Sequence, residues 1–202
     1  MSKQAPYHHG DLRNALLDAG EAELAESGVN GFSLRRVAAR VGVSHAAPTH
    51  HFGDRAGLID ALAARGFAQL LAAMEARQKA APDDPHERLV ASGLGYLDFV
   101  MARPALFRLA FNTPMRPEAS ADLVAAASAA YRHIAQGVAA VHGVASADEP
   151  GLCNEVLRHW SQAHGFAELL LAGHVELTAD TGEGQSGHEA LYRNIFGPVR
   201  NA

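Results

Sequence analysis

Residues 32–58, FSLRRVAARVGVSHAAPTHHFGDRAGL, predict a helix, a tight turn and a second short helix. Ser33 can cap the first helix with its hydroxyl, and Phe32 and Val37 occupy the two positions of a hydrophobic staple. Gly42 ends that helix, because a residue without a Cβ enters the left-handed conformation at little cost. Two helices joined by a short turn with a glycine are typical of units that place the second helix in the DNA major groove.

The second helix is expected from His45 to about Phe52, after the turn Gly42-Val43-Ser44 and with Ser44 as its cap. Pro48 removes an intrahelical hydrogen bond, so we expect an irregular or 3₁₀-like start. An ordinary two-helix corner in an all-α domain has similar spacing and stays an alternative. The candidate DNA contacts are small or hydrogen-bonding side chains: Ser44, His45, Ala46, Thr49, His50 and His51.

Three arginines complete the candidate DNA-binding set. Arg35, Arg36 and Arg55 lie at or near predicted helix N-termini, where backbone N–H groups and a guanidinium together favour phosphate. We expect these arginines to position the protein on DNA rather than to distinguish bases.

The same stretch resembles, without a gap, the N-terminal DNA-binding domain of the tetracycline-repressor-like (TetR) family of bacterial regulators. The preceding segment, from Tyr7 to the stop at Gly28, resembles the first helix of that family. Two positions depart from the family pattern: Thr49 stands where a phosphate-binding Tyr is usual, and Ala46 where Gly is usual. The residues that carry the resemblance are Ser33, Val37-Ala38, Gly42-Val43-Ser44, His51-Phe52, Arg55 and Leu58.

Length and charge agree with two functional domains, which we divide as residues 1–54 and 55–202. The net charge is −5, yet the first 55 residues hold six Lys or Arg and six Asp or Glu, so these 55 residues are neutral and the remainder carries the −5. Five of the 12 His lie in those 55 residues, which gain positive charge as the pH falls. This modest electrostatic attraction predicts that binding relies on a dimer presenting two DNA-binding domains.

Cysteine content and the N-terminal stretch predict the compartment. The single cysteine, Cys153, cannot form an intrachain disulfide and suits a reducing cytosol. The stretch MSKQAPYHHGD lacks the apolar core of a signal peptide, and Asp98 and Glu168 interrupt the best candidates for an 18-residue apolar run. We therefore expect a soluble, cytoplasmic protein without a membrane partner.

Beyond residue 55 the pattern is helical, with no alternating strand signal, and the fold class is all-α with about nine helices, which matches the architecture of the family. Asp84 with Glu87, and Ser146 with Glu149, have capping-box spacing. Thr113–Pro117 and Thr178–Gly187 are expected as loops. The predicted helices are Arg55–Lys79, Pro85–Ala102, a short one from about Arg103-Pro104 to Asn112, Glu118–Val141, about 149–172 with Gly173 as its stop, and His188–Phe196.

The helix of about residues 149–172 carries a second resemblance. Its segment His159–Gly165, HWSQAHG, resembles the Trp, His, Gly signature of one TetR C-terminal domain type. In such proteins the last two helices pair with their copies, which implies a homodimer. The alternative is that Trp160 fills an internal core and His164 hydrogen-bonds within it. The candidate dimer stripe, at near four-residue spacing, is Leu152, Val156, Trp160, Ala163 and Ala167.

Large side chains in the C-terminal domain are candidates for an effector cavity, because ligand sites are mostly apolar with a few polar groups. Ordinary core packing is the alternative for each of them. The candidate pocket residues are Phe99, Phe107, Phe111, Tyr131, Trp160 and His164. A ligand held there would be a small apolar molecule.

Metal and enzyme functions find little support in the sequence. His8-His9 and His50-His51 are adjacent pairs and His159 and His164 are five apart, so none has the i, i+4 spacing of a helical zinc pair, and we predict neither metal nor cofactor. No phosphate-binding glycine loop, nucleophile elbow or dinucleotide fingerprint occurs. The sequence therefore predicts a regulator that binds a palindromic operator as a homodimer, most simply a repressor released by a small-molecule effector. The competing interpretation is a helical sensor with a weakened DNA-binding domain, motivated by Thr49 and the neutral charge.

Overall fold

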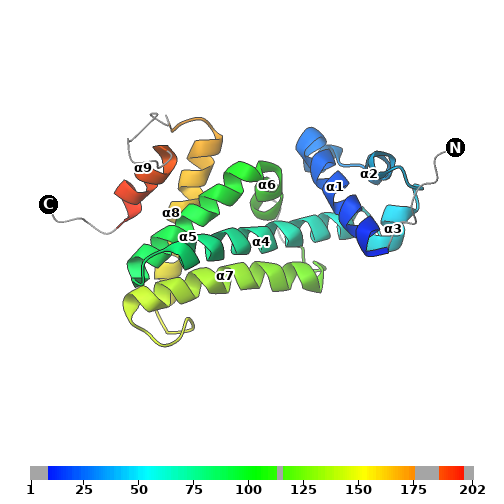
Figure 1. Cartoon of the computed structure of the whole chain (residues 1–202). Helices are drawn as coiled ribbons and strands as arrows, with labels where there is room; N and C mark the ends of the chain where they lie inside the picture. The colour runs from blue at the N-terminus through cyan, green and yellow to red at the C-terminus, as the bar shows by residue number, and fades with distance from the viewer. Residues whose placement is uncertain (1–8, 113–115, 176–186, 198–202) are drawn as a thin grey trace. The chain divides into compact units, whose positions relative to one another are not determined.

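The computed structural model describes residues 9–112, 116–175 and 187–197, and its secondary structure there is entirely helical (Figure 1). Most of the predicted loop Thr178–Gly187, residues 113–115 of the loop Thr113–Pro117, and the pair His8-His9 in part lie outside the described residues. The nine described helices are α1 (His9–Gly31), α2 (Leu34–Val41), α3 (Ala47–Phe52), α4 (Arg55–Ala80), α5 (Pro85–Ala102), α6 (Pro104–Asn112), α7 (Ala121–His142), α8 (Leu152–Leu171) and α9 (Gly187–Phe196).

Helix ends that are defined by strong local signals lie where the sequence predicts them. The α5 helix begins at Pro85, and the Asp84 carboxylate caps it by accepting a hydrogen bond from the Glu87 N–H at 2.9 Å. Gly28, with φ of 63°, interrupts α1 and confirms the predicted stop. Gly173, with φ of 72°, follows α8 in the left-handed conformation that glycine adopts at little cost.

Two of the helix starts predicted beyond residue 55 are wrong. The α7 helix begins at Ala121 rather than Glu118, because Ser120 caps it by accepting a hydrogen bond from the Leu123 N–H at 3.3 Å. The α8 helix begins at Leu152, and Ser146 instead accepts a hydrogen bond from the Asp148 N–H at 3.1 Å in the preceding turn. A helix capped by Ser146 would have Pro150 in its fourth position, where proline lacks the N–H that the ladder needs.

The chain forms two compact units, each described here by itself. The head unit comprises the described residues up to Phe67 together with Ala105–Ala126, and the body unit comprises Ala68–Pro104 with the described residues from Ala127 onward. The functional boundary between residues 54 and 55 remains a prediction, since the head unit also takes in the first half of α4, α6 and the start of α7.

The head unit packs α1, α2 and α3 around Phe32, Val37 and Leu58, which are at most 4% exposed. In the same unit the Phe111 ring lies 5.3 Å from Phe67 and 5.2 Å from Phe107.

Asp60 joins α4 to the segment before α7 inside the head unit. Its carboxylate is nearly buried and accepts hydrogen bonds from the Arg116 guanidinium and from the Ser120 N–H, both at 2.8 Å. Because a buried carboxylate is costly without partners, these two bonds fix that segment against α4.

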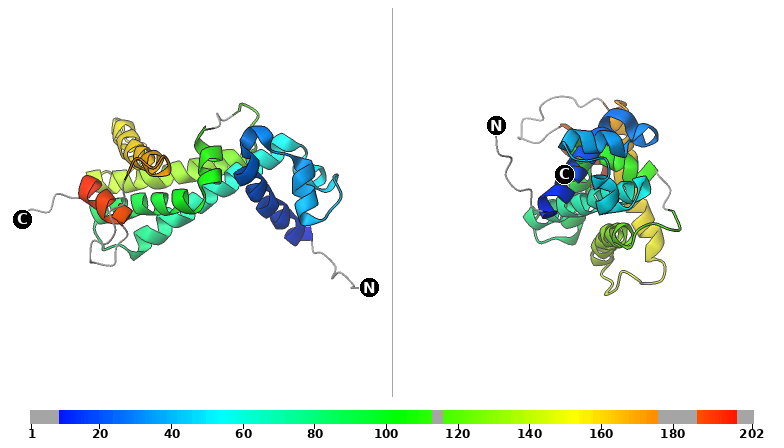
Figure 2. Two further views of the ribbon diagram at one scale, coloured as in Figure 1. Left: turned by 90° about the horizontal axis from the view of Figure 1, so that it is seen from above. Right: turned by 90° about the vertical axis from the view of Figure 1, so that its right-hand side faces the viewer.

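In the body unit the second half of α4 and α7 run with similar axis directions, α5 lies oblique to both, and α8 crosses α4 and α7 steeply (Figures 1 and 2). The α4 and α5 backbones approach closely at Gly95, where an added Cβ would lie 2.4 Å from the Ala73 carbonyl oxygen. Among the described helices only α4 is long and apolar enough to cross a membrane, and half of its most apolar window is buried inside the protein. The interrupted runs at Asp98 and Glu168 are therefore not the best candidates for a span.

Candidate DNA-binding surface and effector pocket

The first helix of the predicted helix-turn-helix, α2, forms as the sequence predicts. The Ser33 hydroxyl accepts a hydrogen bond from the Arg36 N–H at 3.4 Å, and Gly42 ends the helix with φ of 76° and ψ of 29°. Both staple residues, Phe32 and Val37, are buried, with 4% and 0% of their surface exposed. Residues 34–41 are therefore held in a fixed orientation on the head unit.

The connection to α3 is longer than predicted, and the assignment of Ser44 as its cap is wrong. The α3 helix begins at Ala47 rather than His45, and Ala46 precedes it without a side-chain capping bond. A start at His45 would place Pro48 in the fourth helical position, whereas the observed start places it in the first turn, where no N–H is needed. The turn therefore covers residues 42–46.

The candidate base contacts fall partly on this turn and partly on α3. Ser44, His45 and Ala46 are exposed on the turn, and Thr49 and His50 are exposed on α3. His51 is half-buried, and its ring lies edge-on to that of His50 at 5.5 Å. Pro48 is buried under this surface and anchors it. Exposed residues 44–46, 49 and 50 are thus available to a partner, and His51 less so.

The three candidate phosphate ligands differ in their surroundings. Arg35 is exposed, and no hydrogen bond or ion pair to it occurs among the described residues. The Arg36 guanidinium donates to the Glu23 carboxylate at 2.5 Å and to the Gly31 carbonyl. The Arg55 guanidinium donates to the Phe32 carbonyl at 3.2 Å and to the Val29 carbonyl. Two of the three arginines therefore bind the head unit itself, which leaves Arg35 as the strongest candidate for phosphate.

Glu23 is a residue of the head that the sequence analysis missed. Its side chain is 1% exposed and lies within hydrogen-bond or ion-pair distance of Arg36, of Ser27 and, at 3.5 Å, of Arg40. Burial by itself raises the pKa of the carboxyl, but the hydrogen bonds from Arg36 and its other partners outweigh burial and leave the pKa below its ordinary value. The position of Glu23 on the apolar face of α1 is the signal that could have indicated a buried ion pair.

A cation–π contact links α3 to α1. The Arg13 guanidinium lies 5.2 Å from the centre of the Phe52 ring, a cation–π contact. Together with the Glu23 ion pairs, this contact braces the helix-turn-helix against the first helix.

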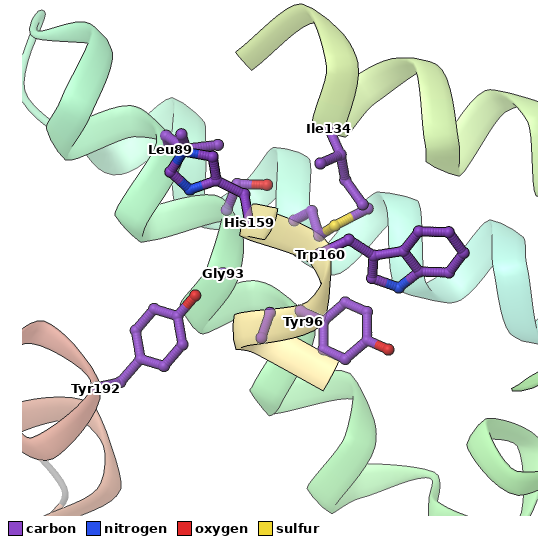
Figure 3. A pocket seen from close by; sticks show the side chains of 10 residues that line it. Leu89, Gly93, Tyr96, Ile134, His159, Trp160 and Tyr192 are labelled. Atoms are coloured by element: carbon purple, nitrogen blue, oxygen red, sulfur yellow. The ribbon is translucent and has the colours of Figure 1, made fainter. Parts of the chain in front are cut away.

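The body unit contains a pocket with a cavity volume of about 30 Å³ (Figure 3). At this size it has room for only one or two water molecules. The residues that line it come from α4, α5, α7, α8 and α9: Met74, Leu89, Ser92, Gly93, Tyr96, Ile134, His159, Trp160, Ala163 and Tyr192.

Trp160 and His164 of the Trp, His, Gly segment bind the same residue of α5. The Tyr96 hydroxyl lies 2.8 Å from His164 Nδ1, and the Trp160 indole also hydrogen-bonds it. Tyr96 is 1% exposed, and burial raises the pKa of its hydroxyl well above the ordinary value, so it is neutral at physiological pH. The tryptophan therefore packs inside the body unit, as the alternative interpretation of the sequence expects, and it also lines the pocket.

Of the six candidate effector residues only Trp160 lines this pocket, and an effector role for the other five stays a prediction. Phe107 and Phe111 pack in the head unit with Phe67. Phe99 is buried in α5, and Tyr131 is 39% exposed with its ring 6.3 Å from that of Trp160. Helical periodicity identified them as large and inward-facing, but it could not show that α6 packs in a different unit from α8.

The candidate dimer stripe on α8 faces the interior of the body unit. Leu152 and Val156 belong to a core cluster with Ala135, Val138 and Ala139 of α7. Ala163 and Ala167 are also buried, with 6% and 0% of their surface exposed.

The opposite face of α8 is open. Leu157 and Leu169 are 46% and 48% exposed, and Ser161 and Gly165 between them are exposed at helical spacing. Any surface that α8 offers to a second subunit is therefore this face, defined by Leu157, Ser161, Gly165 and Leu169, and not the predicted stripe.

Two family models match the chain. Residues 16–62 match the bacterial regulatory proteins of the tetR family, and residues 89–191 match the tetracyclin repressor-like C-terminal domain. The HTH-type transcriptional regulator BetI of Burkholderia ambifaria is 38% identical over 82 residues, which cover 40% of this chain and 42% of that relative. The match thus spans less than half the length of the relative.

Solved structures resemble the whole described fold. A protein of unknown function from Rhodococcus sp. RHA1 has a TM-score of 0.75 and 31% identity, with coverage of 96% of this chain and 100% of that one. The structure of AibR in complex with isovaleryl coenzyme A and operator DNA has a TM-score of 0.64 at 14% identity, with coverage of 93% and 99%. The second likeness shows the fold alone.

Proposed function

This chain belongs to the TetR family of bacterial regulatory proteins, and on that premise we propose that it is a transcriptional repressor that leaves its operator when a small molecule binds the body unit. Proteins of this family are DNA-binding regulators rather than enzymes. The observation that carries the proposal is the exposed turn and helix of residues 44–50, held by a buried proline on a braced helix-turn-helix.

The proposed DNA contacts fall into two classes, according to which hydrogen-bonding groups of each side chain are not already used within the head unit. His45, Thr49 and His50 are exposed and can donate or accept hydrogen bonds, and the Ala46 methyl can contact a thymine methyl, so these residues select the sequence. Arg35 supplies phosphate contact, while Arg36 and Arg55 orient the head from within. With one free arginine and no net charge over residues 1–55, a single head binds weakly.

A homodimer supplies the second head, and the palindromic operator follows from its two-fold symmetry. The open face of α8, centred on Leu157 and Leu169, is the surface we assign to the subunit contact. Half-exposed leucines with Ser161 and Gly165 between them allow two helices to approach closely. Operator binding by such a protein takes place in the cytoplasm.

The effector site that we assign is the pocket at Trp160 and Tyr96. It is lined from five helices, so a ligand that enlarges it must move at least some of them. Support for this kind of control comes from AibR, a protein of the same fold whose structure holds both isovaleryl coenzyme A and operator DNA. A ligand releases DNA only if it binds the released conformation more tightly than the DNA-bound one.

The test is a gel shift of the purified protein on the DNA upstream of its own gene, with a random duplex of equal length as control. The repressor predicts a specific complex that survives competition by random DNA. A second candidate, a helical sensor with a weakened DNA-binding head, is favoured by Thr49 and by the internal bonds of Arg36 and Arg55. Equal affinity for both duplexes would support that candidate and refute the repressor.

A further inference from the structure

The pocket of the body unit offers hydrogen bonds but no fixed charge. None of its ten lining residues is Lys, Arg, Asp or Glu. The Ser92 hydroxyl lies 3.2 Å from His133 Nε2 just behind the lining, and the His159 imidazole is part of the lining itself. An ionised ligand would lose its hydration here without gaining an opposite charge, which makes its burial costly.

The two imidazoles do not supply that charge. Burial lowers the pKa of His133 and outweighs the opposing effect of Glu75. Burial likewise lowers the pKa of His159 and outweighs the effect of Glu155, and the cationic Arg158 lowers it further. Both rings are therefore neutral at pH 7 and can each donate one hydrogen bond and accept another.

The apolar part of the lining suits a flat ring. Trp160 and Tyr96 contribute aromatic faces and edges, and Met74 contributes a thioether that adapts to an aromatic partner. Leu89 and Ile134 close the remaining sides.

A phenol ring of the protein itself already occupies part of this space. Tyr192 of α9 directs its hydroxyl at Gly93 of α5, on the opposite side of the pocket from Trp160 in Figure 3. A Cβ on Gly93 would lie 2.0 Å from the Tyr192 hydroxyl oxygen and 2.6 Å from the ring carbon that bears it. Only glycine at position 93 leaves room for the tyrosine, and with the ring in place the cavity is too small for an organic ligand.

Two ion pairs and a group of aromatic contacts hold α9 to the rest of the body unit. Glu189 lies 3.4 Å from the Arg77 guanidinium, and Arg193 lies 3.0 Å from Glu87. These pairs are partly exposed, and pairs of that kind stabilise a fold only weakly. The Tyr192 ring also packs at 5.6 Å from Phe166 of α8 and 4.7 Å from Phe196.

We propose that the effector is an uncharged aromatic molecule with one hydrogen-bonding group, and that it enters the pocket by displacing the Tyr192 ring. The inference rests on the proposed function, because it names the ligand class of the same effector site. The ligand reproduces what the phenol of Tyr192 provides, a flat ring and one polar group, and as a free molecule it can direct that polar group at Ser92 or His159 in the lining.

The experiment uses the full chain and p-cresol, which is the tyrosine side chain as a free molecule. Isothermal titration calorimetry compares p-cresol with 4-methylbenzoate, a charged analogue of similar size, and with toluene, which lacks the polar group. In Tyr192→Ala no ring needs displacing, so p-cresol binds at least tenfold more tightly than to wild type, and at least tenfold more tightly than either analogue.

A second variant tests the same point with the tyrosine present. Gly93→Ala forces the Tyr192 ring out of its position and raises p-cresol affinity in the same direction. The matched control is Gly66→Ala in α4, where the added Cβ would lie at an ordinary 3.5 Å from Leu106, and both residues belong to the head unit. This variant should bind p-cresol as wild type does. If Tyr192→Ala does not fold, the Gly93→Ala result decides.

Two results would overturn the inference: 4-methylbenzoate binding as tightly as p-cresol, or folded variants whose p-cresol affinity equals that of wild type. A gel shift separates this failure from failure of the proposed function. Tight p-cresol binding with unchanged operator affinity would support the ligand class and refute the effector switch. Release of operator DNA by a charged compound that p-cresol does not displace would refute the ligand class and leave the repressor function intact.

Discussion

Val156 and Leu157 are neighbours on α8 with opposite surroundings, and replacing each should have a different effect. Val156 is 1% exposed and packs in the core cluster with Val138 and Leu152, whereas Leu157 is 46% exposed on the open face. We expect Val156→Ala to weaken the fold and leave the proposed dimer intact. We expect Leu157→Glu to dissociate the dimer and leave the fold of each subunit intact.

The burial of each side chain sets the size of the effects. Val156→Ala removes two buried methyl-sized groups at about 0.8 kcal/mol each and leaves a cavity, for a total loss of about 2–3 kcal/mol. For a chain of this length that loss lowers Tm by about 5–10 °C. Leu157→Glu changes a half-exposed position, so the cost within one subunit is about 0.5 kcal/mol. In a symmetric dimer, however, the new charge enters the contact twice.

Light scattering at micromolar concentration, thermal unfolding at several protein concentrations and a gel shift on the operator measure the three consequences. A dimer gives a Tm that rises with concentration, and Leu157→Glu should remove that rise together with operator binding. Val124→Glu is the matched control, since Val124 is 45% exposed on α7 in the head unit and the variant should stay dimeric. Dissociation of Val156→Ala without loss of stability, or a fully dimeric Leu157→Glu that binds operator, would refute the reasoning.

Three further predictions concern the head. Arg35→Gln should flatten the slope of log K against log salt concentration by about 0.9, whereas Arg36→Gln should mainly destabilise the head; gel shifts across a salt series with equal slopes would contradict this. Thr49→Ala should weaken the preference for one base at one position per half-site, and the lost difference in binding free energy should be about 1–3 kcal/mol. Selection of the same motif from a random library by both proteins would count against a base contact. Because the pKa of Glu23 is lowered in the folded state, its stabilising contribution is complete above the ordinary value of 4.5 and is lost as the pH falls below it. Urea unfolding of Glu23→Gln should therefore show less acid destabilisation than wild type, and an identical pH dependence would sink the idea.

Helix ends were predictable where one residue type alone determines them. Gly42 and Gly173 end helices because of their positive φ, and Asp84 begins one because its carboxylate caps the N–H of Glu87. Two errors occurred where a proline lies four residues after a good cap, at a position that needs its N–H. Ser44 and Ser146 both have capping chemistry, but Pro48 and Pro150 each exclude a helix that starts directly after that serine, so both helices begin later.

The candidate site was predictable only in part. Helical periodicity shows which residues share one face of a helix, but it does not show which element packs against that face. Leu152, Val156 and Ala163 do share one face of α8, as predicted, but the sequence could not show that Leu152 and Val156 pack against α7 while the face of Leu157 stays open. The pocket depends on longer-range packing still. Tyr192 reaches it only because α9 docks on α5, and no local pattern in residues 187–196 indicates that contact.

Two continuous helices would give the proposed effector of the body unit a physical route to the head unit. Both α4 and α7 contribute residues to the body unit and to the head unit, and Met74 of α4 and Ile134 of α7 line the pocket. In the head unit Asp60 of α4 accepts hydrogen bonds from Arg116 and from the N–H of Ser120, the residue that caps α7. A ligand that shifts α4 or α7 must therefore move the N-terminal parts of both helices together, or it must break the hydrogen bonds of the nearly buried Asp60 carboxylate. Since a tenfold loss of operator affinity needs only about 1.4 kcal/mol of coupling, less than the usual cost of leaving such a group unpaired, we expect the two helices to move as one body in the head.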